Sequence, residues 1–108
     1  MIYLEDSELI DAMSTQIARE FSPLQIILFG SHARGQAGAH SDVDFLVVLP
    51  DVANKRLKAI EIRRRLSGYP IAKDIIVTTP DEIVRRGQLV GSILRSALRD
   101  GRVIYERP

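Results

Sequence analysis

The stretch FGSHARG (residues 29–35), followed by SDVDFLVV (residues 41–48), is the most informative part of this sequence. Gly30 and Ser31 come directly after an apolar run at residues 26–29, and two aspartates open a second apolar run at residues 45–49. Both runs have the length and composition of buried strands. The sequence therefore predicts a tight turn that leaves one strand and a pair of carboxylates that enters the next.

The two aspartates, Asp42 and Asp44, are spaced to share one face of a strand, because residues i and i+2 point the same way. Two carboxylates held about 6 Å apart repel by ~3 kcal/mol at an effective dielectric constant near 20. A hard divalent cation offsets that repulsion. Either motif alone has a simpler interpretation, a common turn or a solvated loop pair. Their combination indicates a site.

Asp74 heads a third strand-like run at residues 74–78, and a buried aspartate without a partner is costly. A salt bridge with Lys73 is one alternative, although adjacent strand residues point to opposite faces. An exposed strand end is the other. Given Asp42 and Asp44, we expect Asp74 to be the third carboxylate of the same site, on the same sheet face.

The rest of the sequence alternates helices and strands, which favours an α/β layer. Strands are expected at residues 25–29, 43–49, 73–78 and 102–105. Helices are expected at residues 7–21, 54–67 and 92–99, from a capping box at residues 79–82 to Gly87, and briefly after the Gly-Ser turn until just before Gly38. Ser7 is the expected cap of the first helix. The inward positions of residues 54–67 are expected to be Leu57, Ile60, Ile62 and Leu66.

The composition is that of an ordinary globular protein, with 45% apolar and 27% charged residues and a net charge of +1. Its 108 residues predict a single domain, residues 1–108. There is no cysteine, no apolar run of membrane-spanning length and no signal peptide at the start. We expect a cytoplasmic protein with no membrane partner.

Positive charge gathers at residues 55–65, where six basic residues stand against the single acid Glu61. The favoured interpretation is the solvated face of a helix, and the alternative is a surface for an anionic partner. No aromatic residue interleaves with these charges, so nucleic acid is not expected as a partner. The basic residues are Lys55, Arg56, Lys58, Arg63, Arg64 and Arg65.

Residues 30–35 together with residues 41–47 resemble the active-site motif of the polymerase-beta nucleotidyltransferase superfamily. More closely, the chain is similar to the minimal nucleotidyltransferase (MNT) branch from about residue 26 onward, including its ending at residues 91–94 and 101–106. The resemblance implies an α/β (α+β) polymerase-beta-like nucleotidyltransferase fold, with a mixed sheet and helices packed mainly on one side. It also implies a Mg-dependent enzyme that uses ATP as a substrate.

In such an enzyme the Gly-Ser turn holds the nucleotide. Gly30 lets the backbone approach the phosphates, and the Ser31 hydroxyl donates to a phosphate oxygen. Arg34 is placed to reach the same phosphates, with a surface arginine as the equal alternative. His32 and His40 have no partners at zinc spacing and are interpreted as surface loop histidines.

The three aspartates supply the metal chemistry that the resemblance implies. Asp42 and Asp44 would hold one or two Mg²⁺ ions, and Asp74 would complete the second metal site. Asp74 would also take the proton of the attacking hydroxyl, directly or through the metal.

The acceptor is expected on a second chain, because the sequence ends after the catalytic core. The MNT resemblance implies that AMP is moved onto a tyrosine of a HEPN-domain RNase toxin, with this chain as the antitoxin in a hetero-oligomer. One alternative is a stand-alone transferase that acts on a small hydroxylated molecule. The other is a non-catalytic antitoxin that blocks its toxin by binding.

Overall fold

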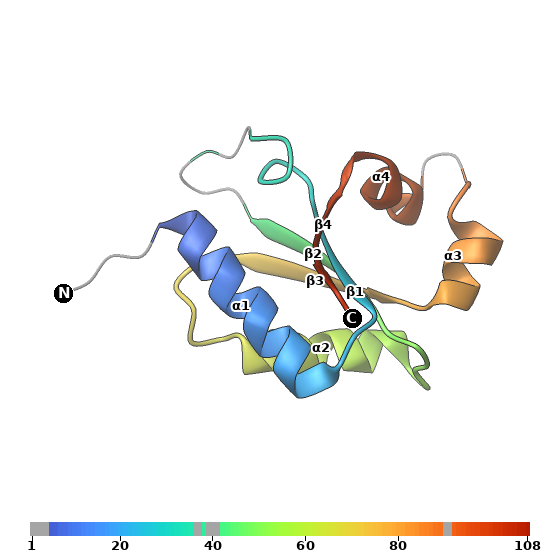
Figure 1. Cartoon of the computed structure of the whole chain (residues 1–108), viewed down its shortest axis with the longest axis horizontal. Coiled ribbons are helices and arrows are strands. Elements are labelled where there is room, and N and C mark those ends of the chain that lie inside the picture. The colour runs from blue at the N-terminus through green and yellow to red at the C-terminus, as the bar shows by residue number, and fades with distance from the viewer. Residues whose placement is uncertain (1–4, 36–37, 39–41, 90–91) are drawn as a thin grey trace.

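The structure is a computed structural model that describes residues 5–35, 38, 42–89 and 92–108. Within these ranges the chain forms helices and strands in the order α1, β1, β2, α2, β3, α3, α4 and β4 (Figure 1). The helices are α1 (Asp6–Phe21), α2 (Lys55–Arg65), α3 (Pro80–Arg86) and α4 (Ile93–Asp100). The strands are β1 (Gln25–Phe29), β2 (Val43–Val48), β3 (Lys73–Thr78) and β4 (Arg102–Glu106).

The strands form one mixed sheet in the order β3-β2-β1-β4. β1 pairs antiparallel with both β2 and β4, and β2 pairs parallel with β3. The parallel pair needs a crossover, which α2 provides between β2 and β3. The site residues at the start of β2 and the start of β3 are therefore brought to the same end of the sheet.

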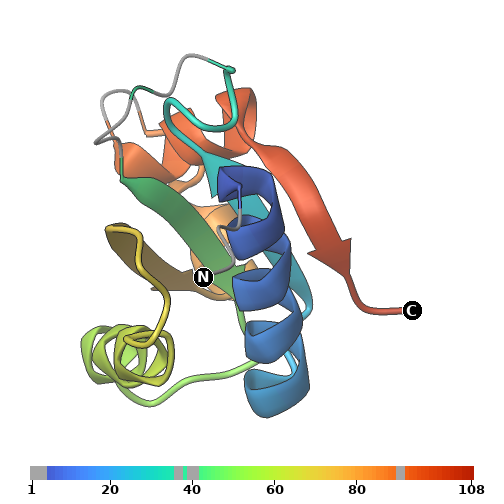
Figure 2. The ribbon, with the colours of Figure 1, turned by 90° about the vertical axis from the view of Figure 1, so that its left-hand side faces the viewer.

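Helices cover both faces of the sheet, as Figures 1 and 2 show from two directions. α1 and α2 pack on the face formed by residues such as Val43, Phe45 and Val47, which are buried in the larger core. α3 and α4 cover the other face, where Leu46 and Val48 are buried. The mixed sheet is confirmed, but the helices do not pack mainly on one side as expected, since only the two longer ones share a face. The two short helices lie on the opposite side.

Most element bounds agree with the sequence prediction. β1 and β3 have the expected bounds, and the N-caps of the last two helices are Thr79 and Ser92. The first helix begins one residue earlier than predicted, with Glu5 rather than Ser7 as its cap. Glu5 forms a reciprocal capping box with Glu8, so a carboxylate takes the role assigned to the hydroxyl.

The short helix expected after the Gly-Ser turn is not found in residues 31–35, which form turns. Two backbone hydrogen bonds close them, from Arg34 to Gly30 (3.2 Å) and from Gly35 to His32 (3.4 Å). Gly35 has a φ of +70°, which takes the backbone out of the right-handed helical region. Residues 36–37 of the expected helix lie outside the described residues, as does Gly91 of the expected ending.

The predicted inward face of α2 was half wrong. Ile62 and Leu66 are fully buried, but Leu57 and Ile60 are 62% and 39% exposed. A helix turns by about 100° per residue, so Ile60 and Ile62 are about 200° apart and cannot face the same core. Within the described residues, no helix has the length and apolar character needed to cross a membrane.

Candidate active site

Asp44 and Asp74 lie side by side at one end of the sheet. In the parallel pairing of β2 with β3, Asp44 is in register with Asp74. Residues in register on neighbouring strands point to the same face, and such strands are about 4.8 Å apart. The pairing therefore puts both carboxylates on the face covered by α3 and α4, as the sequence predicts for these two residues.

The third carboxylate, Asp42, precedes β2 and is exposed. It belongs to no strand, so the i and i+2 argument does not fix its direction. Its negative charge nevertheless acts on Asp44, since it contributes to raising the pKa of that residue. Asp42, Asp44 and Asp74 are thus electrostatic neighbours.

Asp44 is the electrostatic centre of this group. Its pKa is raised above its ordinary value, first by burial and then by the charges of Asp74 and Asp42. His32 and Arg34 act in the opposite direction and favour the charged carboxylate. Each of these shifts has the sign expected for a half-buried acid between like and opposite charges. Asp44 is therefore held in a position where a cation would be strongly favoured.

Gly30 and Asp44 lie in close contact. Gly30 has a φ of +76°, and a Cβ atom built on it would lie 2.2 Å from Asp44 Oδ2. Phe29, the residue before it, is directly opposite Asp44 in the antiparallel ladder. The sequence interpretation gave Gly30 the task of letting phosphates approach the backbone. The structure adds a second reason for glycine, which is the space that the Asp44 carboxylate occupies.

The turn at residues 31–35 carries the other predicted nucleotide-binding residues. Ser31 is half-buried, and Arg34 is exposed with its charge acting on Asp44. Both residues are therefore at the same end of the sheet as the carboxylates. Because residues 31–35 are not helical, the amide groups that were expected at a helix N-terminus belong instead to a tight turn.

His32 lies closer to the candidate site than the sequence suggested. It is half-buried, and its charge favours the ionised form of Asp44. The signal was its position directly after Ser31, which the zinc-spacing argument did not consider. His40 lies outside the described residues.

The carboxylates fit a magnesium ion in donor type. Mg²⁺ is commonly bound through one or two carboxylates and the phosphate oxygens of a substrate. In the part of the chain that the structure describes, no three acidic or histidine side chains come together closely enough to hold a metal ion. The in-register pair of Asp44 and Asp74 thus provides two carboxylates at most for one ion, and the remaining ligands would come from substrate and water.

Comparison with known proteins gives one family and several relatives. The family described as nucleotidyltransferase domain matches residues 10–104. The protein adenylyltransferase MntA of Thermococcus cleftensis is 29% identical over 106 residues, covering 97% of each chain. MJ1305 of Methanocaldococcus jannaschii, provisionally named a protein adenylyltransferase, is 29% identical over 89 residues. That alignment covers 78% of this chain and 59% of the relative, so the chain spans less than two thirds of that protein.

A solved toxin-antitoxin structure with AMP-PNP has the same fold. It superposes with a TM-score of 0.65 at 19% identity and covers 90% of this chain and 73% of the other. At this identity the likeness concerns the fold alone. Together with the family match, it identifies the mixed sheet and its helices as the polymerase-beta-like nucleotidyltransferase fold.

Proposed function

The chain belongs to the nucleotidyltransferase domain family, and from that premise we propose that it transfers AMP from ATP onto a hydroxyl of a partner protein. The acceptor in this proposal is a tyrosine of a HEPN-type RNase toxin, which makes the chain the antitoxin of a cytoplasmic toxin-antitoxin pair. The observation that carries the proposal is the in-register pairing of Asp44 with Asp74 beside Gly30. The names of the two relatives that are adenylyltransferases support the choice of reaction.

Binding of the nucleotide is assigned to the Gly-Ser turn. Gly30 gives the triphosphate access to the backbone, and the Ser31 hydroxyl donates to a phosphate oxygen. The positive charge of Arg34, which already acts on Asp44, attracts the same phosphates. These residues hold the α-phosphorus over the carboxylates.

Asp42, Asp44 and Asp74 are the residues that would hold Mg²⁺, with no more than two of them on any one ion. When bound, one or two ions would neutralise the triphosphate and polarise the α-phosphate. The tyrosine oxygen forms a bond to the α-phosphorus, pyrophosphate leaves, and Asp74 accepts the phenolic proton. Asp74 suits this role because it is exposed, so an acceptor hydroxyl can reach it.

The test uses purified protein, the cognate toxin, ATP and Mg²⁺. We expect the toxin to gain the mass of one or more AMP units, and the Asp44→Asn variant to give no such gain. Cells that carry the variant should lose protection from the toxin. Full protection by the variant would mean that neutralisation is by binding alone. If AMP were transferred to a small hydroxylated molecule and the toxin were not modified, the acceptor would be that small molecule and not a protein.

A further inference from the structure

The side of α2 that faces away from the sheet carries two exposed apolar residues among cations. Leu57 and Ile60 are 62% and 39% exposed, although Ile62 and Leu66 of the same region are fully buried. At about 100° per residue, these two residues and Arg64 lie together on the side opposite Ile62. We call this surface the α2 outer face, and it consists of Arg56, Leu57, Ile60, Arg63 and Arg64.

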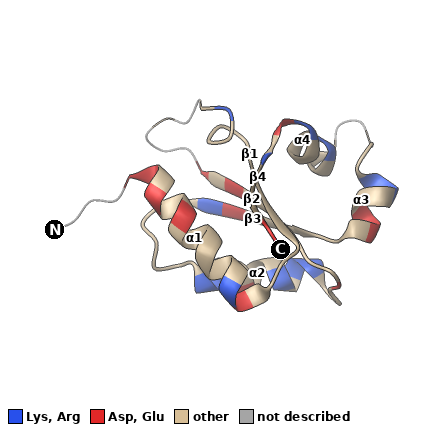
Figure 3. Cartoon of the chain, viewed as in Figure 1, with Lys and Arg blue, Asp and Glu red and all other residues tan. Residues whose placement is uncertain are grey.

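The cations of α2 fall into two groups. Lys55, Lys58 and Arg65 each form an ion pair, with Glu82, Glu61 and Glu20 respectively. Lys58 also lies over the ring of Phe21, 5.8 Å from its centroid, and so packs toward α1. The arginines of the α2 outer face make no ion pair within the described ranges. Figure 3 shows that basic residues are concentrated along α2.

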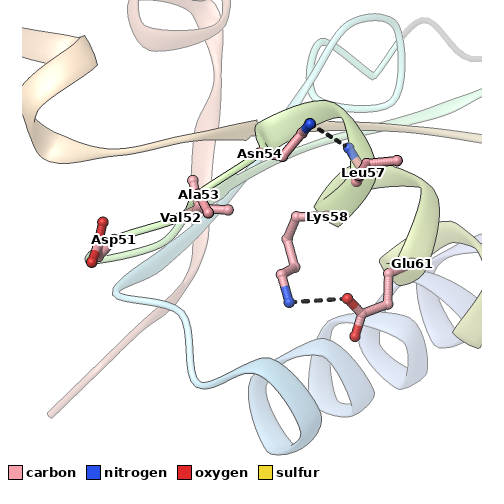
Figure 4. A pocket seen from close by; sticks show the side chains of 7 residues that line it. All are labelled: Asp51, Val52, Ala53, Asn54, Leu57, Lys58 and Glu61. Carbon is pink, nitrogen blue, oxygen red and sulfur yellow. Dashed lines mark hydrogen bonds and ion pairs between the residues drawn. The ribbon is translucent and has the colours of Figure 1, made fainter.

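A hollow of about 400 Å³ adjoins the first turn of α2 (Figure 4). Leu57 is part of its wall, with Val52 and Ala53 from the preceding loop. The Lys58–Glu61 ion pair (2.9 Å) lies at its border, and Asn54 accepts a hydrogen bond from the Leu57 amide (3.0 Å). The hollow is open and partly apolar, and the side chains of Asp51 and Glu61 also line it.

The C-terminal end of α2 lies close to the start of β3, the strand that carries Asp74. Lys73, the residue before Asp74, donates hydrogen bonds to the carbonyls of Leu66 (3.1 Å) and Tyr69 (3.2 Å), just beyond α2. The last turn of α2 is thus close to the start of β3, an edge strand of the sheet. A protein bound along α2 would have to reach around the β3 edge to meet Asp74, which faces the opposite side of the sheet.

We propose that the α2 outer face is the docking surface for the acceptor protein, and that the acceptor presents carboxylates around an apolar side chain. This inference rests on the proposed function, because it names where the acceptor binds. Three arginines that make no ion pair with another described residue provide the charge complementarity, and Leu57 with its hollow provides the apolar anchor. Nucleic acid fits less well, because two aliphatic side chains occupy the middle of the face and no aromatic side chain is available for stacking.

The test compares two charge-reversal variants of equal net charge. One changes the outer face, Arg56→Glu/Arg63→Glu/Arg64→Glu. The control changes exposed arginines of α3 and α4 on the other side of the sheet, Arg85→Glu/Arg86→Glu/Arg99→Glu. A third variant, Leu57→Ser/Ile60→Ser, removes the apolar contact while keeping the charge. Each is measured for binding to the purified cognate toxin at two salt concentrations, for ATP binding and for AMP transfer.

We expect the outer-face charge variant to bind the toxin at least tenfold more weakly than wild type, with unchanged ATP affinity. The serine variant should also lose at least tenfold, but with the salt dependence of wild type. The control should bind as wild type does. Asp44→Asn should bind the toxin normally without modifying it, which separates docking from chemistry.

Equal toxin binding by wild type and both outer-face variants would overturn the inference and leave the proposed function intact. A wild-type protein that neither binds nor modifies the toxin would overturn both. Binding of a 20-nucleotide uridine RNA that is lost only in the outer-face charge variant, with toxin binding unchanged, would reassign the surface to nucleic acid.

Discussion

A side chain at residue 30 would force the Asp44 carboxylate to move, which glycine avoids. The Asp44 carboxylate occupies the position that a Cβ atom of residue 30 would take. The positive φ of Gly30 adds a second requirement for glycine, because L-residues in this region carry a cost of about 1–2 kcal/mol. Glycine at this position thus suits both the turn and the space that a candidate metal ligand occupies.

The Gly30→Ala variant should lose AMP transfer by about 100-fold or more, because the new methyl group displaces the Asp44 carboxylate. Gly35→Ala is the matched control. Its φ is also positive at +70°, but an added Cβ would meet nothing within 4 Å. Both variants should lose about 1–2 kcal/mol of stability in urea titrations, and only Gly30→Ala should lose the activity. Equal losses of activity would show that turn strain, not the Asp44 contact, matters.

The Asp44→Asn variant should be inactive and more stable than wild type at neutral pH. The pKa of Asp44 is raised by burial and by Asp74 and Asp42, so its ionised form is held at a cost in the folded state. The stability of wild type therefore falls as pH rises through the pKa of Asp44. Urea midpoints of the two proteins should differ at pH 7 and converge in acid, where Asp44 is protonated. A variant less stable than wild type at pH 7 would contradict this account.

Glu82 joins three elements near the far end of the sheet. Its carboxylate accepts hydrogen bonds from Thr78 at the end of β3 (2.5 Å) and from Lys55 at the start of α2. Thr79 caps α3 by accepting from the Glu82 amide (3.2 Å). Burial alone would raise the pKa of Glu82, but the bonds from Lys55 and Thr78 outweigh it and lower the value. Glu82 therefore stabilises the fold while it is ionised.

Glu82→Gln should lower stability by about 1 kcal/mol at pH 7, an estimate that allows for the solvent exposure of Lys55. A lowered pKa means that this contribution exists above the ordinary carboxyl pKa and is lost as pH falls. In urea titrations the loss should therefore shrink as pH falls and vanish once Glu82 is protonated in the folded state. Asp81→Asn is the control, because Asp81 forms an exposed ion pair with Arg85. If both variants lost the same free energy of unfolding, the hydrogen bonds of Glu82 would contribute no more than an exposed ion pair does.

The sequence predicted best those helices and strands whose bounds are set by a local sequence pattern. β1 and β3 are short apolar runs between turn residues, and α3 begins at a capping box with proline at its first position. The α2 face was mispredicted because an apolar residue in a helix was taken to be buried. Leu57 and Ile60 show that a helix of a small domain can keep apolar residues on its outer side.

The candidate site could be predicted in its residues but not in its geometry. The spacing of Asp42 and Asp44 indicated a shared site, yet Asp42 precedes the strand and only Asp44 is in register with Asp74. That register depends on the parallel pairing of β2 and β3, which no local pattern contains. The contact of Gly30 with Asp44 likewise depends on the antiparallel pairing of β1 with β2.

The molecule as a whole places its candidate chemistry at one end of the sheet and its exposed basic helix along one edge. The starts of β2 and β3 and the end of β1 meet where Asp44, Asp74 and Gly30 lie. α2 crosses on the other face and returns to the same end through Lys73. In the proposed reaction, nucleotide and acceptor would therefore bind from different sides of the sheet.

Binding of ATP with Mg²⁺ should stabilise the whole chain, because carboxylates that repel one another in the free protein gain a cation. A ligand at 100 times its Kd adds about 2.7 kcal/mol to the free energy of unfolding, roughly 10 °C in Tm for a domain of this size. We expect this rise in a thermal melt with both ligands, and its loss on chelation with EDTA or in Asp44→Asn. Arg63→Ser/Arg64→Ser/Arg65→Ser should keep the full rise, because these residues lie on α2 across the sheet from Asp44. An equal rise in Tm for Asp44→Asn would show that the nucleotide does not bind at the carboxylates. The stabilisation would then not depend on the charge that Mg²⁺ neutralises.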